Sequence, residues 1–158
     1  MKGIAVAGTL VADNIKMTDS YPGKGMLADI SRTDKGIGGC VSNTAAGVKL
    51  LDPSVPVKSI GLVGEDDNGR FLKERLSRLG IDTEGIRMTP DAVTSFSDVM
   101  TVEETGERTF FHDRGACRLF SQEHMGLDTL DAKLVLIGYG GLLDSLNLPD
   151  EVCGTKLA

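Results

Sequence analysis

Residues 36–51 read GIGGCVSNTAAGVKLL, and this stretch decides the fold class. Its Ala-rich second part has the composition of a helix over 42–51, with Ser42 as the predicted N-cap. Gly38 and Gly39 precede that helix, and glycines in this position expose bare backbone N–H groups at its positive end. The pattern predicts either a ligand-binding glycine loop or a tight turn that needs a positive φ.

Apolar runs of strand length surround this loop and helix. Residues 3–11 are continuously apolar, which is typical of a strand buried on both faces. The other elements predicted in the core are strands over 57–63, 83–88 and 133–139, and a helix over 67–79 that stops at Gly80. Because strands alternate with helices, the predicted fold class is α/β, with a Rossmann-like, mostly parallel sheet flanked by helices.

Two segments interrupt the alternation of strands and helices. Residues 95–102 and 107–111 flank Glu-Glu-Thr-Gly and are predicted to form a half-exposed hairpin. Residues 14–35 contain turn signals between two further possible strands. These segments, about 14–37 and 94–112, are expected to form a small antiparallel β lid inserted in the α/β core.

The composition limits the classes of partner. The chain has 158 residues, 41% hydrophobic and 25% charged, and one domain over 1–158 is expected. A net charge of -6 without a Lys/Arg stripe argues against nucleic acid. No apolar run reaches the roughly 20 residues of a spanning helix, which argues against a membrane. Widely spaced Cys40, Cys117 and Cys153 indicate neither a disulfide framework nor a zinc site, so a reducing cytoplasm is expected.

Two polar residues stand where open α/β sheets place ligand contacts. Asp13 follows the predicted first strand, and its carboxylate can accept two sugar hydroxyls, although a solvated or capping aspartate is the alternative. Asn43 both donates and accepts hydrogen bonds, which suits a polyhydroxylated molecule. A dinucleotide-dependent oxidoreductase is disfavoured, because Val41 occupies the last glycine position of the GxGxxG pattern.

Other polar and aromatic residues have plainer interpretations. Residues 61–69, GLVGEDDNG, precede a helix whose positive end favours acidic residues, so this motif is assigned to structure. Arg114 could meet a carboxylate or phosphate of a substrate, but a solvated arginine is the favoured interpretation. The residues expected to be structural or to pack the lid are His112, His124, Phe96, Phe110 and Phe111.

Taken together, these motifs resemble the ribokinase-like (PfkB-type) carbohydrate kinases. The order and spacing that carry the resemblance are GTLVAD, GGCVSNTA, GLVGEDDNG, the strand at Thr94, GERTFF and Gly115-Ala116. The resemblance covers the N-terminal half of that family and implies a β lid over a bound sugar. Because the lid segments have an edge and one face in need of cover, the sequence predicts that they either cover the pocket or pair with a second copy in a homodimer. The substrate-binding residues that it implies are Asp13, Gly38, Gly39, Asn43 and Ser97.

The resemblance also implies chemistry that this sequence does not contain. The family uses ATP and Mg²⁺, and its catalytic base lies in a C-terminal Gly-Ala-Gly-Asp motif that is absent here. We therefore expect a truncated kinase that carries the sugar-binding side and lacks the ATP site, with no catalytic residue and no activity of its own. A non-catalytic sugar-binding or interaction module is the alternative. Val11, Cys40 and Gly138-Tyr139 depart from ribokinase and argue against ribose as the substrate.

Overall fold

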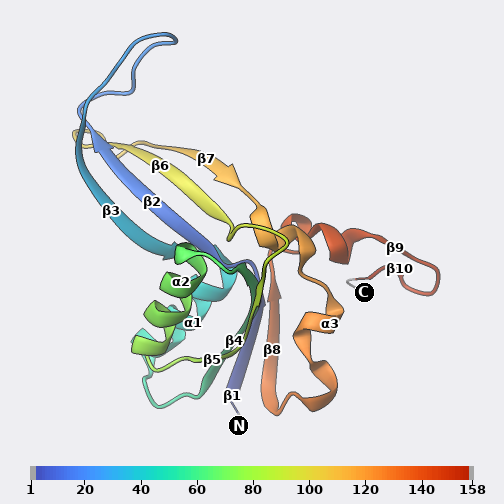
Figure 1. The fold of residues 1–158 in the computed structure, drawn as a ribbon. Helices are drawn as coiled ribbons and strands as arrows, with labels where there is room; N and C mark the ends of the chain where they lie inside the picture. Colours follow the sequence, from blue (N-terminus) through green and yellow to red (C-terminus); the bar gives the residue numbers. More distant parts are fainter. Residues whose placement is uncertain (1–2, 157–158) are drawn as a thin grey trace.

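A four-stranded parallel sheet forms the core of the protein, whose computed structural model describes residues 3–156 (Figure 1). Its strand order is β5-β4-β1-β8, and each neighbouring pair is parallel. The strands are β1 (Gly3–Gly8), β4 (Val57–Gly64), β5 (Asp82–Thr89) and β8 (Ala132–Gly138). The α/β fold class predicted from the alternation of apolar runs is confirmed.

The two faces of this sheet are covered differently. Helices α1 (Gly39–Leu51) and α2 (Asp67–Arg78) lie on one face, while the short helices η1 (Gly115–Leu119) and α3 (Gln122–Met125) lie on the other (Figure 1). Successive side chains of a strand point to opposite faces, so Val6 of β1 joins the first core and Ala5 and Ala7 join the second. The central strands β1 and β4 are therefore buried on both faces, as the apolar run over 3–11 predicts for the first of them.

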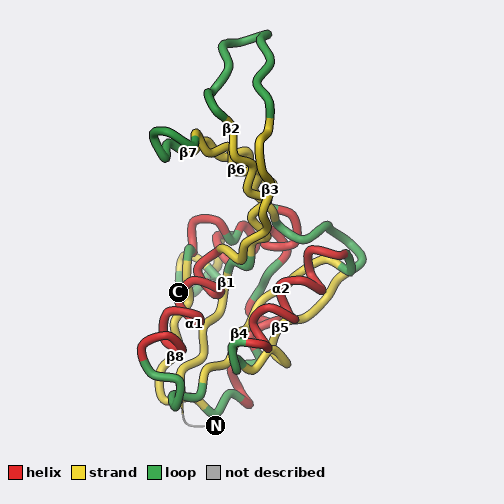
Figure 2. The backbone as a smooth tube through the Cα atoms, turned by 90° about the vertical axis from the view of Figure 1, so that its left-hand side faces the viewer, coloured by secondary structure: helices red, strands yellow, loops and turns green. Residues whose placement is uncertain are grey.

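A second four-stranded sheet projects away from the core (Figures 1 and 2). We call it the lid sheet; its order is β3-β2-β6-β7. Its strands are β2 (Val11–Thr18), β3 (Ile30–Gly38), β6 (Phe96–Val102) and β7 (Arg108–Asp113). The pairs β2-β3 and β6-β7 are antiparallel hairpins, but β2 and β6 pair in parallel. The expectation of antiparallel pairing therefore holds within each hairpin and not between them.

The first strand is shorter than predicted, and Asp13 lies in a strand instead of the loop after one. Gly8 has a φ of 134°, which ends β1 and redirects the chain into β2 of the lid sheet. Val11 and Ala12, the first residues of β2, are buried as well, so the sequence stays apolar beyond the end of β1. Hydrophobic pattern alone cannot show where the chain passes from one sheet to the other.

Helix α1 begins three residues earlier than predicted, and Ser42 is not its N-cap. Gly38 occupies the N-cap position, and Thr9, which is distant in sequence, accepts hydrogen bonds from the first turn of the helix. The Cys40 N–H donates to Thr9 Oγ1 at 3.0 Å, and the Val41 N–H donates to the Thr9 carbonyl at 3.1 Å. Ser42 is buried inside the helix, and its hydroxyl has no hydrogen-bond partner. The glycine pair is thus itself the helix start.

The remaining described elements are short and follow or flank β8. They are the 3₁₀ helices η2 (Leu127–Thr129), η3 (Gly140–Leu142) and η4 (Asp144–Asn147), and the strands β9 (Pro149–Asp150) and β10 (Gly154–Thr155). Strand β8 is at the edge of the core sheet, and its Leu134 and Val135 are partly exposed. Within residues 3–156, no helix is long and apolar enough to cross a membrane.

Candidate functional site

A cavity of about 270 Å³ lies where the lid sheet joins the core. Thr9 and Tyr139, which line it, directly follow β1 and β8, so the cavity is at the carboxyl ends of core strands, where open α/β sheets bind ligands. The cavity is lined by Thr9, Val11, Asp13, Gly39, Ser97, Phe110, His112, Arg114, Cys117, Tyr139 and Leu142.

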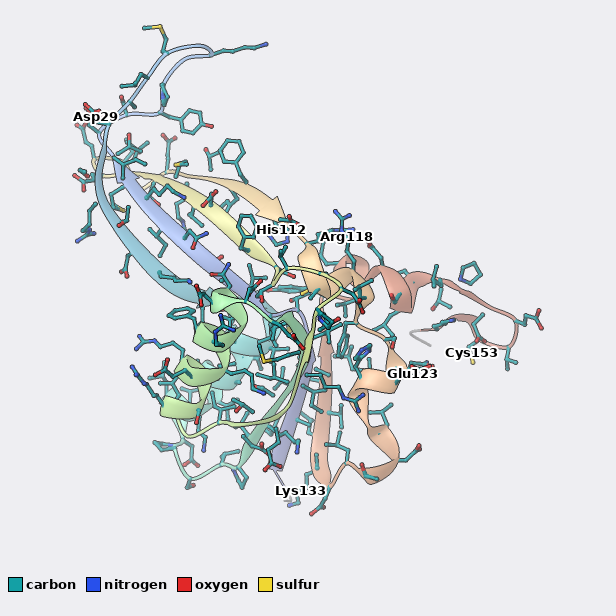
Figure 3. The ribbon with its side chains drawn as sticks, viewed as in Figure 1. Asp29, His112, Arg118, Glu123, Lys133 and Cys153 are labelled. Atoms are coloured by element: carbon teal, nitrogen blue, oxygen red, sulfur yellow. The ribbon has the colours of Figure 1, made fainter. Side chains whose placement is uncertain are left out.

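Three polar side chains form a row across the lid sheet at this cavity. Asp13 of β2 pairs in register with Ser97 of β6, and Ser97 pairs with His112 of β7. The Ser97 hydroxyl lies 3.0 Å from His112 Nδ1. Figure 3 shows His112 where the lid meets the core. Since in-register neighbours share a face of the sheet, carboxylate, hydroxyl and imidazole point into the same space.

The Asp13 carboxylate lies against the backbone of Gly38. A Cβ on Gly38 would come within 2.3 Å of Asp13 Oδ2, so a side chain here would displace the carboxylate. Gly39 has a φ of 83°, and a Cβ on it would lie 2.5 Å from the Thr9 carbonyl oxygen. Gly39 is therefore required by its conformation and by its close approach to the Thr9 backbone, whereas Gly38 leaves room for the Asp13 carboxylate.

Asn43 does not line this cavity. It lies one helical turn after Gly39 in α1, and its side chain is exposed. The structure therefore brings Asp13, Gly38, Gly39 and Ser97 together and leaves Asn43 outside them.

Burial raises the pKa of Asp13 above its usual range. The hydrogen bond from Ser97 and the electrostatic influence of His112 and Arg108 lower this pKa, without cancelling the effect of burial. A partly desolvated carboxylate is short of hydrogen bonds from water. Hydroxyl groups of a ligand in the cavity can donate these hydrogen bonds to Asp13.

Comparison with known proteins gives this arrangement a family. The model of the pfkB family carbohydrate kinases matches residues 1–152. The chain belongs to the pfkB family of carbohydrate kinases. The resemblance inferred from the order of the motifs is thereby confirmed.

The pfkB-family relatives are longer than this chain. It is 32% identical over 129 residues to "Probable fructokinase-6, chloroplastic" of Arabidopsis thaliana, which covers 80% of this chain and 32% of the fructokinase. An ATP-dependent ribose-1-phosphate kinase of Halopiger xanaduensis is 27% identical over 135 residues, or 85% of this chain and 43% of that kinase. The chain thus spans about a third to two fifths of the length of these relatives.

Solved structures share the fold. A ribokinase from Giardia lamblia has a TM-score of 0.74 and 24% identity, with 87% of this chain and 42% of that chain covered. An uncharacterized sugar kinase from Pyrococcus horikoshii, in complex with ATP, has a TM-score of 0.67 and 28% identity, with 85% and 42% covered. The Arabidopsis thaliana ribokinase complexed with ribose and ATP has a TM-score of 0.69 and 23% identity, with 87% and 45% covered.

The acidic side chains among the described residues do not gather into a metal site. Among residues 3–156 there is no group of three His, Cys, Asp or Glu side chains that could hold a metal ion. The acidic motif at 65–67 is committed to structure: Asp66 is the N-cap of α2, and its carboxylate accepts from the Gly69 N–H at 2.8 Å and from the Thr94 N–H at 2.7 Å.

Sequence reasoning missed two side chains that line this cavity, His112 and Arg114. Arg114 lines the cavity and, although partly solvated as expected, pairs with Asp144 at 2.7 Å. His112 could have been found from the hairpin, because a register centred on the Glu-Glu-Thr-Gly turn places it opposite Ser97. Phe110, expected to pack the lid, lines the cavity with 56% of its surface exposed.

Asp13→Asn is expected to stabilise the unliganded chain. A pKa raised by folding means that ionised Asp13 costs stability at neutral pH and that this cost disappears below the usual aspartate pKa. Asparagine keeps the acceptor for Ser97 without the charge. We expect Tm to rise by about 1–2 °C at pH 7, and the difference to shrink toward about pH 4. Thermal denaturation monitored by circular dichroism measures both.

The control for this stability change is Asp29→Asn. Asp29 is exposed at the far end of the lid (Figure 3), where neutralising a carboxylate should leave Tm unchanged. A lower Tm for Asp13→Asn than for the parent at pH 7 would contradict the desolvation of Asp13.

Proposed function

We propose that the protein to which this chain belongs transfers a phosphoryl group from ATP to a hydroxyl of a sugar or sugar-like alcohol. In this proposal residues 1–158 are the N-terminal, sugar-binding part of a ribokinase-like kinase domain, with lid segments at about 14–37 and 94–112. The observation that supports it is the row of Asp13, Ser97 and His112 in the cavity at the carboxyl ends of the core strands. A row of one carboxylate and two groups that both donate and accept suits adjacent hydroxyls.

Each proposed substrate-binding residue has a distinct part. The Asp13 carboxylate accepts two hydroxyls of the sugar, and Ser97 holds the carboxylate by a hydrogen bond. Gly38 and Gly39 let the sugar approach backbone at the positive start of α1. Asn43, exposed one turn further along α1, would meet a part of the ligand that extends outside the cavity.

ATP and Mg²⁺ would supply the transferred group and its charge neutralisation in the intact enzyme. The chain has no Gly-Ala-Gly-Asp motif, so we assign it no catalytic residue and expect it to bind sugar without turnover. The same absence favours the second candidate, a non-catalytic sugar-binding module.

An ATP-consumption assay on the purified 158-residue chain, combined with titration calorimetry of a sugar and nucleoside panel, tests this proposal. We expect a ligand that binds with 1:1 stoichiometry and no ligand-dependent ATP hydrolysis. Sugar-dependent turnover would contradict the assignment of catalysis to residues outside this chain, and an absence of binding by every sugar would contradict the sugar site itself.

We further propose that the lid mediates a homodimer. A second cavity of about 640 Å³ lies on the lid, where its lining includes Met26, Leu27 and Phe111. Phe110 and Phe111 are successive in β7, so this cavity is on the face opposite the candidate sugar site. Met26 and Leu27 are 73% and 84% exposed, an apolar surface that a second copy would cover.

Leu27→Asp is expected to weaken this dimer. A charge in the interface would have to be desolvated, so we expect the dissociation constant to rise by about 10-fold or more. Sedimentation velocity over a concentration series measures it, with the exposed Leu51→Asp on α1 as the control. A parent chain that stays monomeric at the highest concentration would refute the proposal.

A further inference from the structure

The carboxylate of Asp13 and the guanidinium of Arg114 line different parts of the same cavity. Asp13 lies in β2, and Arg114 directly follows β7, two strands away in the lid sheet. At the usual spacing of neighbouring strands this separation is about 9–10 Å. One polyhydroxylated chain can therefore meet Asp13 near one end and Arg114 near the other.

Hydrogen bonds to the chain just before β6 hold the backbone at Arg114 in place. The buried Ser95 hydroxyl donates to the Arg114 carbonyl and accepts from the Cys117 N–H at 3.2 Å. The Ala116 N–H donates to the Val93 carbonyl at 2.8 Å, which ties the same turn to the chain before β6. Arg114 is therefore presented at the cavity by a rigid turn and not by a free loop.

The guanidinium already holds a carboxylate. Arg114 Nη1 donates to Asp144 Oδ1 at 2.7 Å, and Nη2 lies 3.4 Å from the Gly141 carbonyl oxygen. The Arg114 and Asp144 side chains are 31% and 47% exposed, and ion pairs this open to water are weakly held. Arginine binds carboxylates through parallel N–H groups, so a better-placed carboxylate can replace that of Asp144.

We propose that the substrate is a sugar acid, a polyhydroxylated chain that ends in a carboxylate, and that Arg114 exchanges the Asp144 carboxylate for that of the substrate. This inference rests on the proposed function, because it places the hydroxyls of the same molecule on Asp13. Asp144 then acts as a stand-in that neutralises Arg114 in the empty site. Arg114 is the residue that distinguishes an acidic sugar from a neutral one.

Calorimetric titration of the 158-residue chain with D-gluconate and D-glucitol tests the proposal. The two share a six-carbon hydroxylated chain and differ by a carboxylate against a CH₂OH group. We expect gluconate to bind about 10- to 100-fold more tightly, and Arg114→Gln to remove that preference while changing glucitol affinity less than about 3-fold. Asp144→Asn removes the competing carboxylate and should raise gluconate affinity about 2- to 5-fold.

The variants and a third ligand separate the outcomes. Arg70→Gln breaks an exposed pair with Asp67, neither of which lines the cavity, and should leave both affinities unchanged. Equal binding of the two polyols, or an equal loss of both in Arg114→Gln, overturns the sugar-acid inference and leaves the proposed function standing. Tighter binding of glucitol 6-phosphate than of gluconate overturns the choice of carboxylate. If neither polyol binds the parent but another member of the sugar panel does, the sugar-acid inference fails and the proposed function stands; if no member of the panel binds, both fail.

Discussion

Asp13→Ala is expected to weaken sugar binding by about 10- to 150-fold, which corresponds to the loss of a charge-assisted hydrogen bond of roughly 1.5–3 kcal/mol. The variant also removes the carboxylate that packs on Gly38 and accepts from Ser97. Titration calorimetry with the tightest ligand of the sugar panel measures the change. Acidifying the solution should also weaken sugar binding, because protonated Asp13 accepts fewer hydrogen bonds. Since burial raises the pKa of Asp13, this loss of affinity should begin at a higher pH than it would for an ordinary aspartate.

Asn14→Ala is the control for this loss of affinity. Asn14 is the next residue of β2, so its side chain is on the other face of the lid sheet, where it donates to Asp98 at 3.3 Å. Sugar affinity should change less than about 3-fold in this variant. Equal affinities of Asp13→Ala and the parent would refute the role of Asp13.

Asp66→Ala is expected to lower the free energy of unfolding by about 2–4 kcal/mol, as the N-cap of α2 is lost and buried donors are left unpaired. Its carboxylate accepts from the Thr94 hydroxyl at 2.7 Å as well as from two backbone N–H groups. Thr94 precedes β6, so Asp66 connects α2 to the strand that carries Ser97. Urea denaturation at pH 7 measures the change.

The control for Asp66 is Asp67→Ala, the next residue. Asp67 is 94% exposed and pairs only with Arg70 among the described side-chain contacts, so we expect less than about 0.5 kcal/mol. Burial raises the pKa of Asp66, but the hydrogen bonds from Thr94, Gly69 and Asn68 outweigh it and lower the pKa. Its contribution is therefore present at neutral pH and is lost as the pH falls below about 4. A pH-independent difference between Asp66→Ala and the parent would contradict this account.

The elements that the sequence predicts well are those determined by local pattern. The strand over 57–63 and the helix over 67–79 need only an apolar run, helical spacing and a stop at Gly80, and the structure has β4 and α2 in those places. The hairpin of β6 and β7 follows from a turn between two polar-apolar strands.

The features that the sequence does not reveal depend on distant residues. The start of α1 is set by Thr9, which is 31 residues away from Cys40, so Ser42 looked like a cap only in isolation. Arg114 finds its carboxylate in Asp144, 30 residues later, so composition around it indicated a solvated side chain. Asp13 was expected in a loop because no local pattern marks the passage from the core sheet to the lid sheet.

A crystal structure of the chain with a bound polyol tests the central claim most directly. Our account predicts the ligand in the cavity between Asp13 and Arg114, with two of its hydroxyls on the Asp13 carboxylate and its chain against Gly38 and Gly39. A polyol bound elsewhere, with the Asp13 carboxylate free of ligand, would contradict it.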